Sequence, residues 1–74
     1  MEIDFIEKLT EALEIESKTV ELSDVFRDYD EWDSLSQLSL IAMLDEEYGV
    51  EIESEDFKKL ITVEDLVKEV KKRQ

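Results

Sequence analysis

The sequence predicts an all-α fold: a small antiparallel four-helix bundle with three main helices, one short helix and a long first loop. Three observations lead to this prediction. Apolar residues recur at helical spacing in three segments, good helix-capping residues precede the later ones, and the chain has one glycine and no proline. We expect residues 1–74 to form a single domain, because no glycine-rich or proline-rich linker divides the chain.

The first helix is expected over about residues 3–14. Its apolar residues recur at helical spacing or lie beside that stripe: Phe5, Ile6, Leu9, Ala12 and Leu13. Acidic residues near its start lie at the positive end of the helix dipole, where they are stabilising. We interpret the apolar set as core packing, which informs the fold and not the function.

Residues 15–32 lose this period and are expected to form a long loop pinned to the core. The expected anchors are Val20, Leu22, Val25 and Phe26. A short helical turn is expected between Ser23 and Phe26, because Ser23 and Asp24 can both cap a helix. Loops of this length are uncommon in compact domains and tend to be functional. We expect this one to span the bundle and deliver Ser34 to one end.

The second main helix is expected to begin at Asp33 and Ser34 and to end at Gly49. Asp33 and Ser34 are both favourable N-cap residues, and Gln37 follows Ser34 at the spacing of a capping box. Gly49 can take the left-handed conformation that closes a helix.

The apolar residues of this second main helix fall on two sides when successive residues are turned by about 100°. A core-facing set consists of Leu40, Ile41, Leu44 and Tyr48. A second set, flanked one turn on by acids, consists of Leu35, Leu38, Ala42, Asp45 and Glu46. So small a domain buries one face of a helix more easily than two, so the second set should be at least partly exposed. An exposed apolar strip with an acidic rim predicts a docking surface.

The last third of the chain predicts an extended connector and two further helices. Val50 and Ile52 alternate with acids, but no partner strand is available, so we expect a connector. Ser54 is expected to cap a brief helix that runs through Leu60, with Phe57 facing the core. The final helix opens at Thr62 in a sequence that resembles a capping box, T-V-E-D. Its expected core face consists of Val63, Leu66, Val67 and Val70.

The charge of the chain restricts its partners. The formal net charge is −13, from 22 acidic and 9 basic residues, and no Lys or Arg lies between Arg27 and Lys58. Such a field repels nucleic acid and anionic membranes and attracts basic protein surfaces, so we expect no nucleic-acid binding and no membrane insertion. The alternative is that the acids serve only solubility.

Most catalytic chemistry is excluded by composition. The chain has no cysteine and no histidine, so disulfides, thiolate metal sites, thiol nucleophiles and imidazole bases are impossible, and we expect no enzyme. Asp28, Asp30 and Asp33 could suggest calcium, but Trp32 stands where the EF-hand loop needs an oxygen ligand and Asp33 where it needs glycine. We therefore expect no metal site. With no signal peptide or membrane span at its start, the chain is expected in the cytoplasm.

The run D-S-L at Asp33, Ser34 and Leu35, followed by a helix ending in D-E-E-Y, resembles the acyl carrier proteins. The resemblance covers nearly the whole chain, including Val20 and Phe26 at family-like positions and V-E-I after the helix. It implies that the hydroxyl of Ser34 receives a 4′-phosphopantetheine arm from coenzyme A. The implied enzyme is a holo-acyl-carrier synthase or another phosphopantetheinyl transferase. The alternative for Ser34 is that it only caps the helix. Ser36 and Ser39 are weaker candidates, because neither opens it.

The resemblance also implies partners for the docking residues. Asp33, Leu35, Leu38, Ala42, Asp45 and Glu46 fall where the family meets partner enzymes. We expect a monomer that carries acyl groups as thioesters and docks on acyl- or aminoacyl-loading and transferring enzymes with basic surfaces. The rival interpretation is an unmodified acidic helical interaction module that uses the same strip without a prosthetic group.

Three residues depart from the housekeeping fatty-acid carriers. Glu31 and Trp32 replace the usual glycine and small residue before D-S-L, and Ser36 replaces the usual acid after it. E-W-D-S-L is more similar to carriers of specialised pathways, such as those that build modified lipids or decorate surface polysaccharides. The acid at Asp33 argues against the peptidyl carriers, which usually have histidine there.

Overall fold

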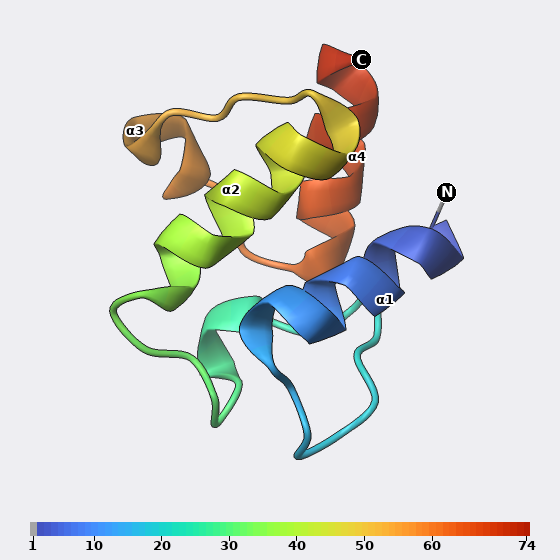
Figure 1. Ribbon diagram of the computed structural model, residues 1–74, viewed down its shortest axis with the longest axis vertical. Helices are drawn as coiled ribbons and strands as arrows, with labels where there is room; N and C mark the ends of the chain where they lie inside the picture. The colour runs from blue at the N-terminus through green and yellow to red at the C-terminus, as the bar shows by residue number, and fades with distance from the viewer. Residues whose placement is uncertain (1) are drawn as a thin grey trace.

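The computed structural model describes the backbone of residues 2–74 and the side chains of residues 3–74. Four α-helices and one 3-10 turn follow in the order α1 Glu2–Leu13, η1 Phe26–Asp28, α2 Ser36–Tyr48, α3 Ser54–Phe57 and α4 Val63–Arg73 (Figure 1). No strand forms within residues 2–74, so the all-α prediction of three main helices, one short helix and a long first loop is confirmed. None of the helices in this described part is long and apolar enough to cross a membrane.

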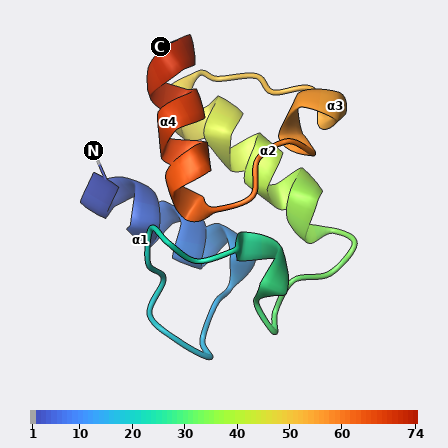
Figure 2. The ribbon, with the colours of Figure 1, turned by 180° about the vertical axis from the view of Figure 1, so that it is seen from behind.

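The middle helix, α2, organises the bundle. Views from opposite sides show α2 between α1 and α3 (Figures 1 and 2). Leu40 and Leu44 of α2 are fully buried, whereas Ile41 and Tyr48 of the predicted core set are only partly buried. Met43 is also buried, with 8% of its surface exposed, which the sequence analysis missed. The core also contains residues from every other element, among them Phe5, Leu9, Phe26, Phe57, Leu66 and Val70.

The ends of α1 and α2 both pass through the left-handed region. Gly49 has φ 66°, as predicted for the residue that closes α2. Glu14 closes α1 with φ 53°, and the N–H of Ile15 donates to the carbonyl of Thr10 at 3.0 Å, the long-range bond of a Schellman motif. Both helices therefore end within one residue of the predicted boundary.

Asp24 organises the long loop after α1. Its carboxylate accepts hydrogen bonds from the Lys18 ammonium at 2.8 Å, the Tyr29 hydroxyl at 2.8 Å and the Glu21 amide at 2.9 Å. Burial opposes ionisation of Asp24, but these donors outweigh it and hold the pKa of the carboxyl below its usual value. Burial and the bond to Asp24 raise the pKa of Tyr29.

The helical turn of this loop lies later than predicted. It spans Phe26–Asp28 instead of Ser23 to Phe26. The Asp24 carboxylate, which was predicted as a possible cap, accepts from the Glu21 amide within the loop instead. The anchors Val20 and Phe26 are buried as predicted. Val25 is wrong as a side-chain anchor, because 36% of its surface is exposed; its backbone forms a β-bridge with Thr62 instead.

The predicted capping box of α4 is confirmed, whereas the predicted cap of α3 is wrong. The Thr62 hydroxyl accepts from the Asp65 amide at 3.2 Å, and the Asp65 carboxylate accepts from the Thr62 amide at 3.1 Å. In α3, Ser54 is the first helical residue, without a side-chain capping bond at the helix start, and the helix ends at Phe57 instead of Leu60. Phe57 nevertheless faces the core as predicted, with 0% of its surface exposed.

Candidate functional site

Ser34 lies in the turn that leads from the long loop into α2. Its side chain is exposed, and the helix itself begins at Ser36. A hydroxyl that must enter the active site of a modifying enzyme needs this exposure, and a serine sealed in the core could not serve. The position of Ser34 therefore fits covalent attachment of a group at the amino end of α2.

Asp33 and Ser36, not Ser34 and Gln37, bond to each other across the turn that leads into α2, and we call this arrangement the cap. Leu35, the residue directly before the helix, makes no side-chain capping bond. The Asp33 carboxylate accepts from the amides of Leu35 at 2.9 Å and Ser36 at 3.1 Å, and the Ser36 hydroxyl accepts from the Asp33 amide at 2.9 Å. The D-x-x-S spacing carried this signal, but the sequence analysis paired Ser34 with Gln37 instead. With the capping done by its neighbours, Ser34 is free for another role.

The same cap separates the three serines of this region. Ser36 is buried, with 6% of its surface exposed, and its hydroxyl also donates to Asp33 at 3.1 Å. Ser39 is exposed, but it lies within α2 and not at its start. Ser34 alone among the three combines exposure with a position at the helix entrance.

The cap also determines the electrostatic surroundings that a phosphodiester on Ser34 would have. Free helix-terminal amides attract an anion, but the amides of Leu35 and Ser36 already donate to Asp33. A phosphodiester on Ser34 would therefore lie beside an occupied cap, and these two amides would not bind it. The residues fit the group as an attachment point that leaves the arm free, not as a cradle that immobilises it.

Glu31 fastens the segment before Ser34 to the end of α1. Its carboxylate accepts from the amides of Glu16 at 2.9 Å and Ser17 at 2.8 Å, and from the Ser17 hydroxyl at 3.0 Å. The bond from the Glu16 amide, aided by the Ser17 bonds, lowers the pKa of Glu31. Sequence reasoning noted that Glu31 departs from the family pattern but missed this role, because its partners are 14 and 15 residues away and no local signal marks them.

We expect Glu31→Gln to lower the melting temperature at pH 7 by a few degrees, because a neutral amide oxygen is a weaker acceptor for these three donors. A folded-state pKa below the unfolded value means that the contribution of Glu31 is present above about pH 4.3 and is lost as pH falls through the folded-state pKa. Thermal melts from pH 7 to pH 3 should therefore show the two proteins converging.

The matched control for this experiment is Glu7→Gln, which removes the same charge from an exposed position on α1. It measures the removal of one exposed charge, for which relief of self-repulsion and loss of a favourable charge in the first half of α1 oppose each other, so its melting temperature should stay close to that of the wild type. Equal melting temperatures for the two variants across the pH range would show that the Glu31 contacts contribute nothing.

The predicted docking residues lie on the surface of α2 and the turn before it. Leu35 and Leu38 have 65% and 63% of their surfaces exposed, which is high for large apolar side chains. The remaining members are exposed as well: Asp33, Ala42, Asp45 and Glu46. Two exposed leucines with acids around them form an apolar strip with a negative rim, and we call these six residues the docking strip.

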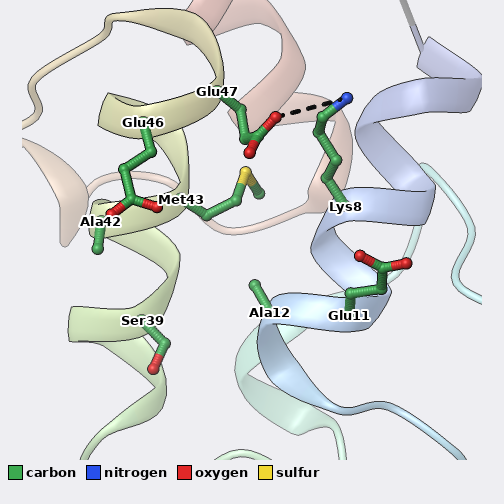
Figure 3. A pocket seen from close by; sticks show the side chains of 8 residues that line it. All are labelled: Lys8, Glu11, Ala12, Ser39, Ala42, Met43, Glu46 and Glu47. Atoms are coloured by element: carbon green, nitrogen blue, oxygen red, sulfur yellow. Dashed lines mark ion pairs between the residues drawn. The ribbon is translucent and has the colours of Figure 1, made fainter.

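One edge of the docking strip borders a cleft between α1 and α2. The cleft has a volume of about 380 Å³ and is lined by Lys8, Glu11, Ala12, Ser39, Ala42, Met43, Glu46 and Glu47 (Figure 3). Lys8 reaches across from α1 to Glu47 of α2, with their charged atoms 3.8 Å apart (Figure 3). A largely solvent-exposed pair of this kind contributes little to stability.

No metal centre forms in the part of the chain that the structure describes. Among the described side chains, those of residues 3–74, no group of three or more acidic residues is arranged to hold a metal ion. Asp33 of the acidic run instead caps α2.

Comparison with known proteins gives this site a family. Residues 4–70 match the family described as "Phosphopantetheine attachment site". The fold is similar to that of a holo acyl carrier protein from Geobacter metallireducens, solved in solution by NMR, with a TM-score of 0.81 and 26% sequence identity. The match covers 97% of this chain and 83% of that one. The chain therefore belongs to the acyl carrier protein family, whose members are carriers of a covalently attached 4′-phosphopantetheine and not enzymes.

Proposed function

We propose that this protein carries acyl groups as thioesters on a 4′-phosphopantetheine arm attached to Ser34 and presents them to partner enzymes. The observation that carries the proposal is the exposed hydroxyl of Ser34 in D-S-L, at the entrance to α2, in a chain of the phosphopantetheine attachment family. The thiol of the arm supplies the thioester chemistry, for which the chain itself has no cysteine.

The residues of this chain prepare Ser34 for attachment. Asp33 and Ser36 fix the turn, and Glu31 ties the preceding segment to the end of α1. The Ser34 oxygen would attack the pantetheine-side phosphorus of the coenzyme A pyrophosphate. The bond from that phosphorus to the bridging oxygen would break, so that a phosphodiester forms on Ser34 and adenosine 3′,5′-bisphosphate leaves. We expect the transferase to supply the base that takes the serine proton, because this chain has no histidine and the neighbouring Asp33 carboxylate already accepts from the amides of Leu35 and Ser36.

We further propose that partner enzymes bind the docking strip through apolar contacts with Leu35 and Leu38 and through basic side chains directed at its acids. The two leucines supply the apolar area that gives affinity, and the net charge of −13 draws basic surfaces toward the strip. The cleft beside the strip offers Glu11, Glu46 and Glu47 to such a partner. Phosphopantetheinyl transferases are the first partner class expected there.

Leu38→Ala should lower the rate constant of arm attachment at low carrier concentration by about tenfold, equivalent to about 1.4 kcal/mol of binding free energy. Ile61→Ala is the matched control, because Ile61 is a comparably exposed large apolar residue, with 54% of its surface exposed, outside α2. The measurement is the initial rate of coenzyme A transfer with both variants folded, as checked by circular dichroism. Equal rates for the two variants would place the contact elsewhere.

The decisive test separates the carrier from an unmodified adaptor. The wild-type protein is incubated with coenzyme A and a phosphopantetheinyl transferase of broad specificity, and its intact mass is measured. A carrier gains the mass of one 4′-phosphopantetheine group. An adaptor that uses the docking strip without a prosthetic group gains nothing, and that result would refute the proposal.

A further inference from the structure

Aromatic side chains fill the interior beside the turn of residues 33–36 that carries Ser34, which we call the attachment turn. Trp32, close before Ser34 in the chain, packs edge-on against Phe26 with ring centroids 5.4 Å apart. Phe26 packs in turn against Phe57 at 5.6 Å, and both phenylalanines have 0% of their surface exposed. The three rings form a continuous stack from the attachment turn through η1 to α3, which we call the aromatic stack.

Arg27 locks the aromatic stack from the side. Its guanidinium carbon lies 4.6 Å from the centroid of the Phe26 ring and 5.2 Å from that of Phe57. One guanidinium nitrogen donates to the carbonyl of Phe57 at 2.9 Å, and another donates to the carbonyl of Leu60. Arg27 therefore joins η1 to the turn after α3, and charge-assisted bonds of this kind are stronger than neutral ones.

An alkyl chain that entered the bundle between η1 and α3 would have to separate these groups. Protein interiors are packed as densely as organic crystals, so extra methylene groups displace side chains instead of filling free space. Here the displaced groups are two fully buried rings and a guanidinium with two carbonyl partners. Separating η1 from α3 would therefore break the hydrogen bonds and ring contacts of Arg27 as well as apolar contacts.

The recess that does open beside the attachment turn suits a polar occupant. It lies on the α1 side, has a volume of about 180 Å³ and is lined by Ala12, Leu13, Glu14, Glu31, Asp33, Leu35, Ser36 and Ser39. Three carboxylates and two hydroxyls line it, and no basic side chain does. Burial of a long alkyl chain against carboxylates gains little, because the charges must stay hydrated.

We infer that this carrier holds its acyl group outside the bundle, and that its substrates are short acyl groups instead of long alkyl chains. The inference rests on the proposed function, since it concerns the acyl group on the Ser34 arm. A small helical bundle could otherwise enclose an acyl chain in its interior. Here the aromatic stack and Arg27 occupy that space.

The test loads the wild-type protein with acetyl, octanoyl or dodecanoyl arms from the corresponding acyl-coenzyme A, using a broad-specificity transferase. Intact mass confirms each loading, and a protein that gains no arm at all would refute the proposed function and not this inference. For the loaded proteins we expect melting temperatures within about 2 °C of one another, because bound apolar groups stabilise a fold only when it buries them. Cleavage of the thioester by hydroxylamine should proceed at similar rates for all three.

A melting temperature that rises with chain length, or slower cleavage of the longer thioesters, would overturn the inference. The variant Phe57→Leu, which shortens one member of the aromatic stack, adds a second test. Octanoyl loading should raise its melting temperature by several degrees above that of its own unacylated form. Ile61→Ala, on the surface, should behave as the wild type does. Absence of any octanoyl effect in Phe57→Leu would show that Phe57 does not close the interior.

Discussion

Ser34→Ala is expected to abolish attachment of the 4′-phosphopantetheine arm while leaving the fold intact. The variant removes the only oxygen at the entrance to α2 that is both a hydroxyl and exposed, within residues 33–36. Because Asp33 and Ser36 provide the cap, loss of the Ser34 hydroxyl should change the free energy of unfolding by no more than about 0.5 kcal/mol. Mass spectrometry after incubation with coenzyme A and transferase measures the first effect, and urea denaturation measures the second.

Ser39→Ala is the matched control for this prediction. Ser39 is an exposed serine within α2, so its variant loses an equivalent hydroxyl about one turn further along the chain than Ser34. It should gain one arm at close to the wild-type rate. A full mass gain in Ser34→Ala, or a loss of attachment in Ser39→Ala, would move the site and contradict the assignment to Ser34.

Local signals predicted the elements whose determinants lie close together in the chain. The end of α2 at Gly49 could be predicted because glycine takes the left-handed conformation that closes a helix, and this depends on the residue itself and its near neighbours. Thr62 opens α4 because its capping partner Asp65 is three residues away. Exposure of Leu35 and Leu38 followed from helix geometry alone, since they lie off the core-facing side of α2.

Interactions between distant segments escaped the sequence analysis. Glu31 bonds to amides at residues 16 and 17, and no periodicity connects these positions. Arg27 lies beside the packed rings of Phe26 and Phe57 and donates to the carbonyl of Leu60, 33 residues away. These contacts form only when the loop has folded onto the helices. They help to fix the position of the attachment turn, but no short sequence pattern predicts them.

The capping bonds before α2 were predicted wrongly for a different reason: two favourable capping residues, Asp33 and Ser34, are adjacent in the sequence. Asp33 and Ser34 each offered a partner three residues on, Ser36 and Gln37. In the structure Asp33 makes the bonds of this turn: its carboxylate accepts from the amides of Leu35 and Ser36, and Ser36 is buried. Which of the two pairs forms depends on which side chain is buried in the folded protein, and the spacing of residues in the sequence does not show this.

Phe57→Ala is expected to remove about 3–5 kcal/mol from the free energy of unfolding, the usual cost of deleting a buried phenyl ring. A domain of 74 residues has a total of roughly 4–11 kcal/mol, so this variant should be marginally folded or unfolded at 25 °C. The large effect follows from the position of the ring: Phe57 has no exposed surface, contacts Phe26 and lies beside the Arg27 guanidinium.

Urea denaturation followed by circular dichroism measures this loss as a lower midpoint at an unchanged slope. Ile61→Ala, four residues further on in the connection between α3 and α4 but 54% exposed, should stay within about 0.5 kcal/mol of the wild type. A loss below about 1 kcal/mol in Phe57→Ala would mean that the ring is not packed as the structure has it, since a fully buried phenyl group cannot be deleted so cheaply. The same experiment thus tests the physical basis on which the interior is held to be closed to an acyl chain, because a ring that contributes little to stability could be displaced by one.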